Sequence, residues 1–133
     1  MILSLDPGRD KCGIAVINSK QKLLHHQIID SVEAIAIIKQ LAQQYAVELI
    51  VIGNGTTSKN WQQQIESDLQ TIPVVAVDER NSTLEARDRY WQMYPAQGLQ
   101  RLVPQSLRTP PRPVDDIVAI ILIERYLALT TSN

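Results

Sequence analysis

The sequence predicts an α/β fold in which a five-stranded mixed sheet is flanked by helices. Three short apolar runs lie close together near the N-terminus, and two later runs are almost continuously β-branched. Strands joined by short turns pair antiparallel, whereas strands joined through helices pair parallel by right-handed crossovers. Three antiparallel strands followed by parallel strands four and five are therefore expected. At 133 residues the chain should form one domain, residues 1–133.

The first three strands are expected over residues 2–6, 12–17 and 22–29. The first is an apolar run that ends in Asp-Pro-Gly, which is a turn signal. The third is more mixed in polarity. Ser31 follows it as a candidate N-cap for a helix that reaches about Ala46, because the apolar side chains between them recur with helical spacing.

The two later strands are expected over residues 47–53 and 73–78. Their nearly continuous apolar character is typical of strands that are buried on both faces. The helix between them should be capped by Thr57 or Ser58. The loop before that helix could offer backbone N–H groups to a phosphate, or it could be an ordinary turn.

A third helix is predicted to begin just past Ser82, because residues 82–85 have the S-x-x-E form of a capping box. Pro95 should stop this helix. Residues 97–113 are rich in proline and arginine and should be mostly irregular. Residues 114–130 form the last predicted helix, which is apolar enough to be largely buried.

Acidic residues stand where the parallel strands are expected to end. Asp6 ends the first strand, Asp78 and Glu79 end the fifth, and Asp115 and Asp116 open the last helix. The carboxyl ends of parallel strands share one edge of the sheet. Mg²⁺ takes hard oxygen ligands, and paired metal ions assist phosphodiester cleavage. Each acid also has a structural interpretation, as a turn residue, an arginine partner or a helix cap.

Helical periodicity separates the last two acids. Asp115 lies at the margin of the apolar stripe of its helix, whereas Asp116 lies on nearly the opposite side. Asp115 is therefore the better candidate to face the sheet edge. Asp116 is better explained as a structural residue.

Charge is nearly balanced overall but uneven along the chain. The net charge is −1 and the pI about 6.1, which argues against affinity from blanket positive charge. Six arginines nevertheless fall between residues 80 and 112, namely Arg80, Arg87, Arg89, Arg101, Arg108 and Arg112. They predict either a phosphate-facing region or a solvated helix followed by a basic loop.

Several other protein classes are disfavoured. No apolar run approaches the length of a membrane span, and the N-terminus does not resemble a signal peptide. The single Cys12 cannot form an internal disulfide, so a reducing cytoplasm is expected.

His25 and His26 are expected on a strand far from the acids, with a structural role. Tyr90, Trp91 and Tyr94 are either core residues or platforms for base stacking, and these aromatics on an amphipathic helix favour the core. Core packing is thus predicted for them.

Three segments of the sequence resemble motifs of a known family. Residues 6–16 are similar to the strand–turn–strand pattern D-x-G-x-x-x-x-G-I/V-A-V of the YqgF (RuvX) family, and residues 78–86 match its D-E-R-x-S/T-T-x-E-A motif. The segment from Val114 to Tyr126 resembles the closing helix of that family. The form Gly-Asn-Gly-Thr after the fourth strand, at residues 53–56, looks more like the YqgF-like domain of Tex-type transcription accessory proteins.

The resemblance implies an RNase H-like fold and a metal-dependent endonuclease acting on structured RNA or branched DNA. Pre-16S rRNA processing and resolution of Holliday junctions are the implied roles. Carried over by position, Asp6, Glu79 and Asp115 would be catalytic and would bind Mg²⁺ or Mn²⁺, with Asp78 and Asp116 as additional candidates. Phosphate contacts are expected from Arg80, Arg101, Arg108 and Arg112, in a monomer or homodimer with no membrane association.

Two other function classes are weighed against the nuclease. A non-catalytic nucleic-acid-binding or interaction module could keep the same fold without turnover. An actin-like ATP-binding protein also opens with strand–Asp-x-Gly–strand, but it needs two such halves, and 133 residues make only one.

Overall fold

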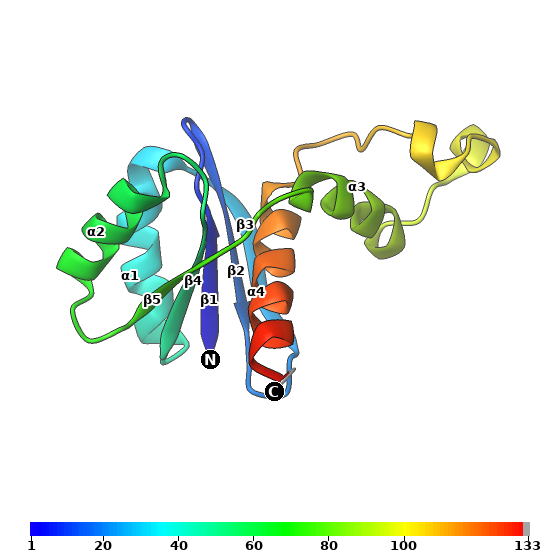
Figure 1. Ribbon diagram of the computed structural model, residues 1–133. Helices are drawn as coiled ribbons and strands as arrows, with labels where there is room; N and C mark the ends of the chain where they lie inside the picture. The colour runs from blue at the N-terminus through cyan, green and yellow to red at the C-terminus, as the bar shows by residue number, and fades with distance from the viewer. Residues whose placement is uncertain (132–133) are drawn as a thin grey trace.

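The computed structural model describes residues 1–131 and contains a five-stranded sheet in the order β3-β2-β1-β4-β5 (Figure 1). The strands are β1 (Ile2–Asp6), β2 (Lys11–Ile17), β3 (Leu23–Asp30), β4 (Leu49–Gly53) and β5 (Val74–Val77). β2 pairs antiparallel with β1 and β3, whereas β4 pairs parallel with β1 and β5. The predicted mixed sheet is confirmed.

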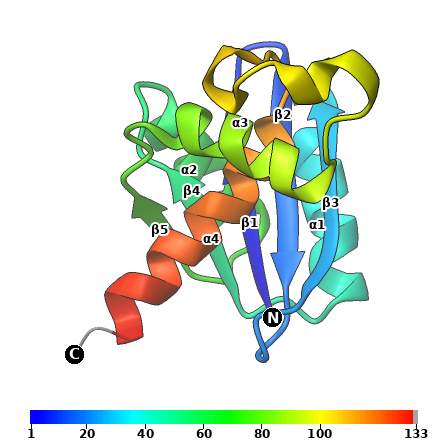
Figure 2. The same cartoon turned by 90° about the vertical axis from the view of Figure 1, so that its right-hand side faces the viewer.

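Helices cover both faces of this sheet. α1 (Ala34–Gln44) and α2 (Ser58–Asp68) lie on one face, and α3 (Ser82–Met93) and α4 (Asp115–Thr131) lie on the other (Figures 1 and 2). α4 packs across β1 and β2, and its apolar residues from 117 to 123 are all buried. Ser4 Oγ donates a hydrogen bond of 2.6 Å to the carbonyl oxygen of Ala119, which joins β1 to the middle of α4 in the core.

The start of α4 lies unusually close to the sheet. A Cβ atom at Gly13 of β2 would stand 1.8 Å from the carbonyl oxygen of Asp115. Any larger residue there would push the helix away. Gly13 is also the cross-strand partner of Asp6 in β1. This glycine therefore brings the first turn of α4 next to the end of β1.

Thr57 stands at the N-cap position of α2, as expected, but its side chain makes no capping hydrogen bond. The other two predicted helix caps are wrong. Ser31 begins a 3₁₀ turn, η1 (Ser31–Glu33), and its hydroxyl donates to the Gly8 carbonyl at 2.9 Å, so α1 starts later, at Ala34. Ser82 is already helical, and no side chain caps the first turn of α3. The Glu85 carboxylate of the expected capping box instead accepts a hydrogen bond of 2.6 Å from Arg125 of α4. Tertiary partners have replaced the local ones in both cases.

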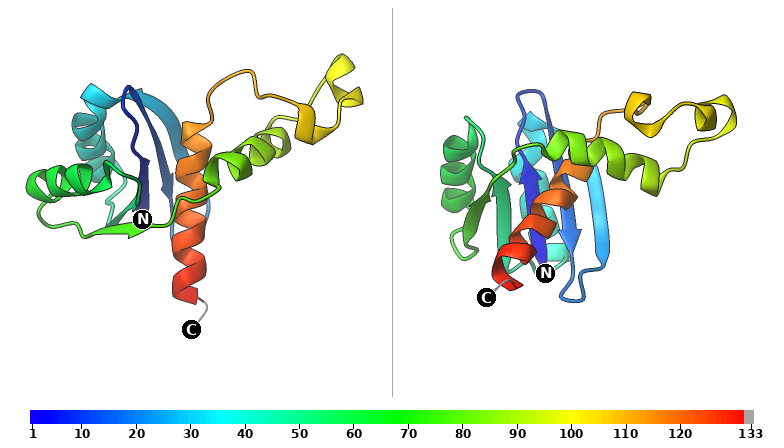
Figure 3. Two further views of the ribbon diagram at one scale, coloured as in Figure 1. Left: turned by 45° about the horizontal axis from the view of Figure 1, so that its top comes forward. Right: turned by 45° about the vertical axis from the view of Figure 1, so that its right-hand side comes forward.

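The proline- and arginine-rich segment projects from the body of the molecule (Figure 3). It holds only two short 3₁₀ turns, η2 (Gly98–Leu102) and η3 (Gln105–Leu107), in agreement with the predicted irregular structure. Leu99, Leu102 and Leu107 are exposed along it. None of the helices within residues 1–131 has both the length and the apolarity to cross a bilayer.

Candidate functional site

Three predicted acids stand at one edge of the sheet. Asp6 is the last residue of β1, Glu79 follows the end of β5 by two residues, and Asp115 is the first residue of α4. β1, β4 and β5 run parallel, so their carboxyl ends share this edge. All three acids are partly buried. The fold therefore brings to one edge three acids that are separated by 73 and 36 residues along the sequence.

The pKa of Asp6 responds to both of the other carboxylates. Burial first, and then the negative charges of Asp115 and Glu79, raise the pKa of Asp6 to about 7. Desolvation and like charges both disfavour an ionised carboxylate. Asp6 is thus the acid of this site whose ionisation is opposed by both of the other two carboxylates.

The two neighbouring acids are perturbed in the same direction. The pKa of Asp115 is raised, first by burial and then by the adjacent Asp116. The pKa of Glu79 is raised by burial and then by Asp78. A site with several acids held against their own repulsion is stabilised by a cation.

Gly53 and Gly55, which flank Asn54 after β4, allow the Glu79 carboxylate to lie against the backbone. A Cβ atom at Gly53 would stand 2.3 Å from Glu79 Oε2, and one at Gly55 would stand 2.2 Å from Oε1. The backbone N–H of Glu79 donates to Asn54 Oδ1 at 3.3 Å. This loop, for which the sequence leaves open a phosphate site or an ordinary turn, therefore holds Glu79 in place. No local sequence pattern signals this contact, because Gly55 and Glu79 are 24 residues apart.

The donor set suits an open metal site better than a closed one. In the part of the chain that the structure describes, no three Asp, Glu, His or Cys side chains lie close enough to hold a metal ion among themselves. Mg²⁺ is commonly held by one or two carboxylates, with waters and substrate phosphates completing the shell. The carboxylates of Asp6, Glu79 and Asp115 have the hard oxygen chemistry for this arrangement.

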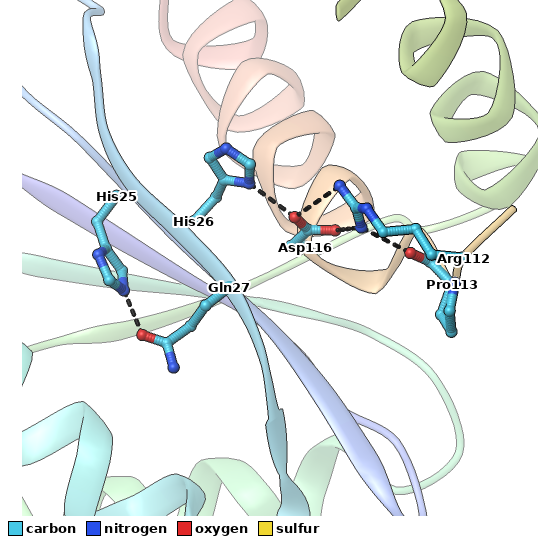
Figure 4. A network of polar contacts seen from close by, with 6 residues as sticks. All are labelled: His25, His26, Gln27, Arg112, Pro113 and Asp116. Atoms are coloured by element: carbon cyan, nitrogen blue, oxygen red, sulfur yellow. Dashed lines mark hydrogen bonds and ion pairs between the residues drawn. The ribbon is translucent and has the colours of Figure 1, made fainter. Parts of the chain in front are cut away.

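Asp116 is held in a separate network (Figure 4). Asp116 is only 3% exposed, and its carboxylate contacts His26 Nδ1 at 2.6 Å and Arg112 Nη1 at 2.9 Å. Burial acts to raise the pKa of Asp116, but the hydrogen bonds from Arg112 and His26 outweigh it and lower the pKa below its ordinary value. The expectation that His26 lies far from the acids is wrong, because α4 packs against β3 and places Asp116 beside His26.

Several predicted phosphate contacts have partners within the protein. Arg112 pairs with Asp116, and its guanidinium carbon lies 5.4 Å from the ring centre of Tyr90. Arg108 lies 5.6 Å from the ring centre of Trp91 and donates to a backbone carbonyl. Tyr90 and Trp91 are buried, as expected of core residues, whereas Tyr94 is exposed, so the core prediction is wrong for Tyr94. The rings of Trp91 and Tyr90 pack against the guanidinium groups of Arg108 and Arg112.

The remaining predicted residues are more open. Arg101 and Arg80 are both exposed. Arg80 lines a hollow with Asp78 and Arg125, and this hollow does not include Asp115. Asp78 Oδ1 accepts the Arg80 backbone N–H at 3.0 Å, which makes Asp78 a turn-forming residue beside Glu79.

Comparison with known protein families decides the relationship. The model of the Tex protein YqgF-like domain matches residues 1–86, which include Asp6 and Glu79. The chain belongs to this family. The match confirms the YqgF relationship expected from the motifs, and Asp115 lies beyond the matched residues.

One curated relative and two solved structures place this YqgF-like domain further. The uncharacterised protein YdcI of Bacillus subtilis (strain 168) is 34% identical over 80 residues, which cover 54% of this chain and 11% of that protein. The chain thus spans about a ninth of that relative. RuvC of Thermus thermophilus superposes with a TM-score of 0.59 at 15% identity, covering 98% of this chain and 96% of RuvC.

A Fowlpox virus resolvase, solved with substrate Holliday junction DNA, gives a TM-score of 0.63 at 14% identity and covers 98% of this chain and 99% of the resolvase. The fold of the YqgF-like domain is therefore RNase H-like, as expected.

Proposed function

We propose that this YqgF-like domain is a divalent-metal-dependent endonuclease that hydrolyses phosphodiester bonds. The observation that carries the proposal is that Asp6, at the carboxyl edge of the sheet, has its pKa raised by burial and then by the charges of Asp115 and Glu79. A buried acid whose pKa is raised by neighbouring carboxylates is typical of sites that bind cations or transfer protons.

One or two of the carboxylates of Asp6, Glu79 and Asp115 would hold each Mg²⁺ or Mn²⁺ ion, with waters and a phosphate of the substrate completing its shell. A divalent ion bound there supplies charge neutralisation at the phosphate and lowers the pKa of a bound water. Gly53 and Gly55 keep Glu79 at its position. Gly13 allows α4 to present Asp115 beside Asp6.

The substrate class that we propose is structured nucleic acid, either a precursor 16S rRNA end or a Holliday-type junction. The shared fold with RuvC and with a resolvase solved on junction DNA supports this class. The molecule would act as a monomer or homodimer in the cytoplasm.

A second candidate is a nucleic-acid-binding module without turnover. The lack of a ready-made three-residue metal cluster within residues 1–131 favours it. The small share of YdcI that this chain covers also favours it, because a domain in a longer protein can serve binding alone.

A cleavage panel separates the two candidates. Precursor rRNA, a four-way DNA junction and a single strand are incubated with wild type, Asp6→Asn and the exposed control Asp10→Asn, in Mn²⁺, Mg²⁺ or EDTA. A nuclease cuts one of these substrates only with metal, loses at least about a hundredfold in rate on Asp6→Asn, and keeps its rate on Asp10→Asn. Binding without metal-dependent cutting would establish the binding module instead.

A further inference from the structure

A cavity of about 420 Å³ lies between α3 and the segment that leads into α4. Its polar lining comes from Thr83 and Arg87 of α3, from Thr109 and Arg112 of the linker (residues 108–114) that leads into α4, and from Asp115, the first residue of α4. Prolines at 110, 111 and 113, together with Val114, form the rest of the linker wall. Because Asp115 is part of the wall, the cavity adjoins the carboxylate edge.

Arg87 differs from the other arginines around α3 and α4. Arg89 makes a bidentate pair with Glu124, and Arg125 binds Glu85. Arg112 is neutralised by Asp116. Arg87, by contrast, is exposed, and no carboxylate or carbonyl within residues 1–131 pairs with its guanidinium.

The groups beside Arg87 suit an oxyanion. Thr83 precedes Arg87 by one helical turn, so both side chains stand on the same face of α3. Thr109 adds a hydroxyl from the opposite wall. A guanidinium forms paired, charge-assisted hydrogen bonds to phosphate oxygens, and hydroxyls complete the shell.

We propose that this cavity binds a backbone phosphate of the nucleic acid, with Arg87 as the principal contact, next to the phosphate held at the carboxylates. This inference rests on the proposed function and specifies how the strand runs, from the carboxylate edge over the first half of α3. The prolines of the linker fix the width of the cavity, since their restricted backbone limits how far that wall can move. The arginines of the projecting segment then act as secondary contacts.

Binding measurements test the proposal. Arg87→Gln, Arg87→Lys and a control, Lys20→Gln, are each made in an Asp6→Asn background that prevents cleavage. Lys20 is exposed in the β2–β3 turn at the opposite edge of the sheet. Fluorescence anisotropy is followed with a labelled four-way DNA junction and a labelled RNA hairpin at several salt concentrations, with constant Mg²⁺.

Arg87→Gln is expected to weaken binding about tenfold and to reduce the slope of log K against log salt by about 0.9 on duplex DNA. Arg87→Lys keeps part of the affinity, because it retains the charge without the paired geometry. Lys20→Gln leaves both quantities unchanged. The stronger response of the two probes identifies the nucleic acid that the cavity prefers.

Equal affinity and equal salt slope for Arg87→Gln and Lys20→Gln would overturn the cavity assignment, provided that the parent binds. The proposed function would survive that result if the wild type cuts the same probe. If the Asp6→Asn parent binds neither probe and the wild type cuts neither, the proposed function itself fails. Thermal unfolding of Arg87→Gln checks that its fold is intact, as expected for an exposed side chain.

Discussion

Replacing Asp6 by Asn is expected to stabilise the fold while removing its proposed activity. The pKa of Asp6 is raised from 3.8 to about 7, by burial first and then by Asp115 and Glu79. Each pKa unit corresponds to about 1.4 kcal/mol, so an ionised Asp6 costs the folded state about 4 kcal/mol at most. Asn removes the charge at nearly constant volume.

The pH dependence follows from the sign of the shift. A carboxyl whose pKa is higher in the folded state binds its proton more tightly when folded, so its contribution to stability falls as pH rises. The destabilisation of the folded state by ionised Asp6 is small near pH 4, grows between pH 4 and pH 7, and is constant above that range. Asp6→Asn should therefore exceed the wild type by about 2–4 kcal/mol at pH 8 and by less than about 1 kcal/mol at pH 4.

Urea unfolding in EDTA at both pH values measures these differences. The exposed control Asp10→Asn should stay within about 0.5 kcal/mol of the wild type at each pH. Adding Mn²⁺ should stabilise the wild type and narrow its gap to Asp6→Asn, because a ligand that binds only the folded state raises its stability. The electrostatic account of the site would be refuted if Asp6→Asn were less stable than the wild type at pH 8. It would also be refuted if the difference in unfolding free energy between the two proteins were the same at pH 8 and pH 4.

Three other substitutions test the supports of the site. Gly55→Ala should displace the Glu79 carboxylate and lower Mn²⁺ affinity and the cleavage rate at least about tenfold, while the free energy of unfolding changes by no more than about 1 kcal/mol. Calorimetric titration with Mn²⁺ measures the affinity, with Thr56→Ala in the same loop as the control. An unchanged Mn²⁺ affinity of Gly55→Ala would contradict this role of Gly55. Gly13→Ala should cost about 3 kcal/mol in urea unfolding, because the added methyl meets the backbone of α4. Asp116→Asn should cost about 2 kcal/mol at neutral pH, and its deficit should vanish as pH falls through the lowered pKa of Asp116; a deficit that persists in acid would exclude the ion-pair explanation.

Local pattern was sufficient where the physics is local. The β-branched runs and the turn signals between them predict all five strands, and the direction of each follows from the length of its connection. The placement of Asp6 and Glu79 at one edge follows from that topology, whereas Asp115 reaches this edge because Gly13 allows α4 to begin close to β2. Asp115 was separated from Asp116 by helical periodicity, and the structure places Asp116 in the network with His26 and Arg112.

Only the tertiary structure decided which partner each polar group takes. Glu85 leaves its expected capping box for Arg125, 40 residues away, because an ion pair between packed helices competes with a local hydrogen bond. The arginines between residues 80 and 112 look alike in the sequence, but the fold neutralises Arg112 and leaves Arg87 open to solvent. The sequence by itself determined the order of strands and helices, since that order depends on periodicity and connection length. The folded chain alone decided the charge state and availability of each functional group, because these depend on burial and on neighbours distant along the chain.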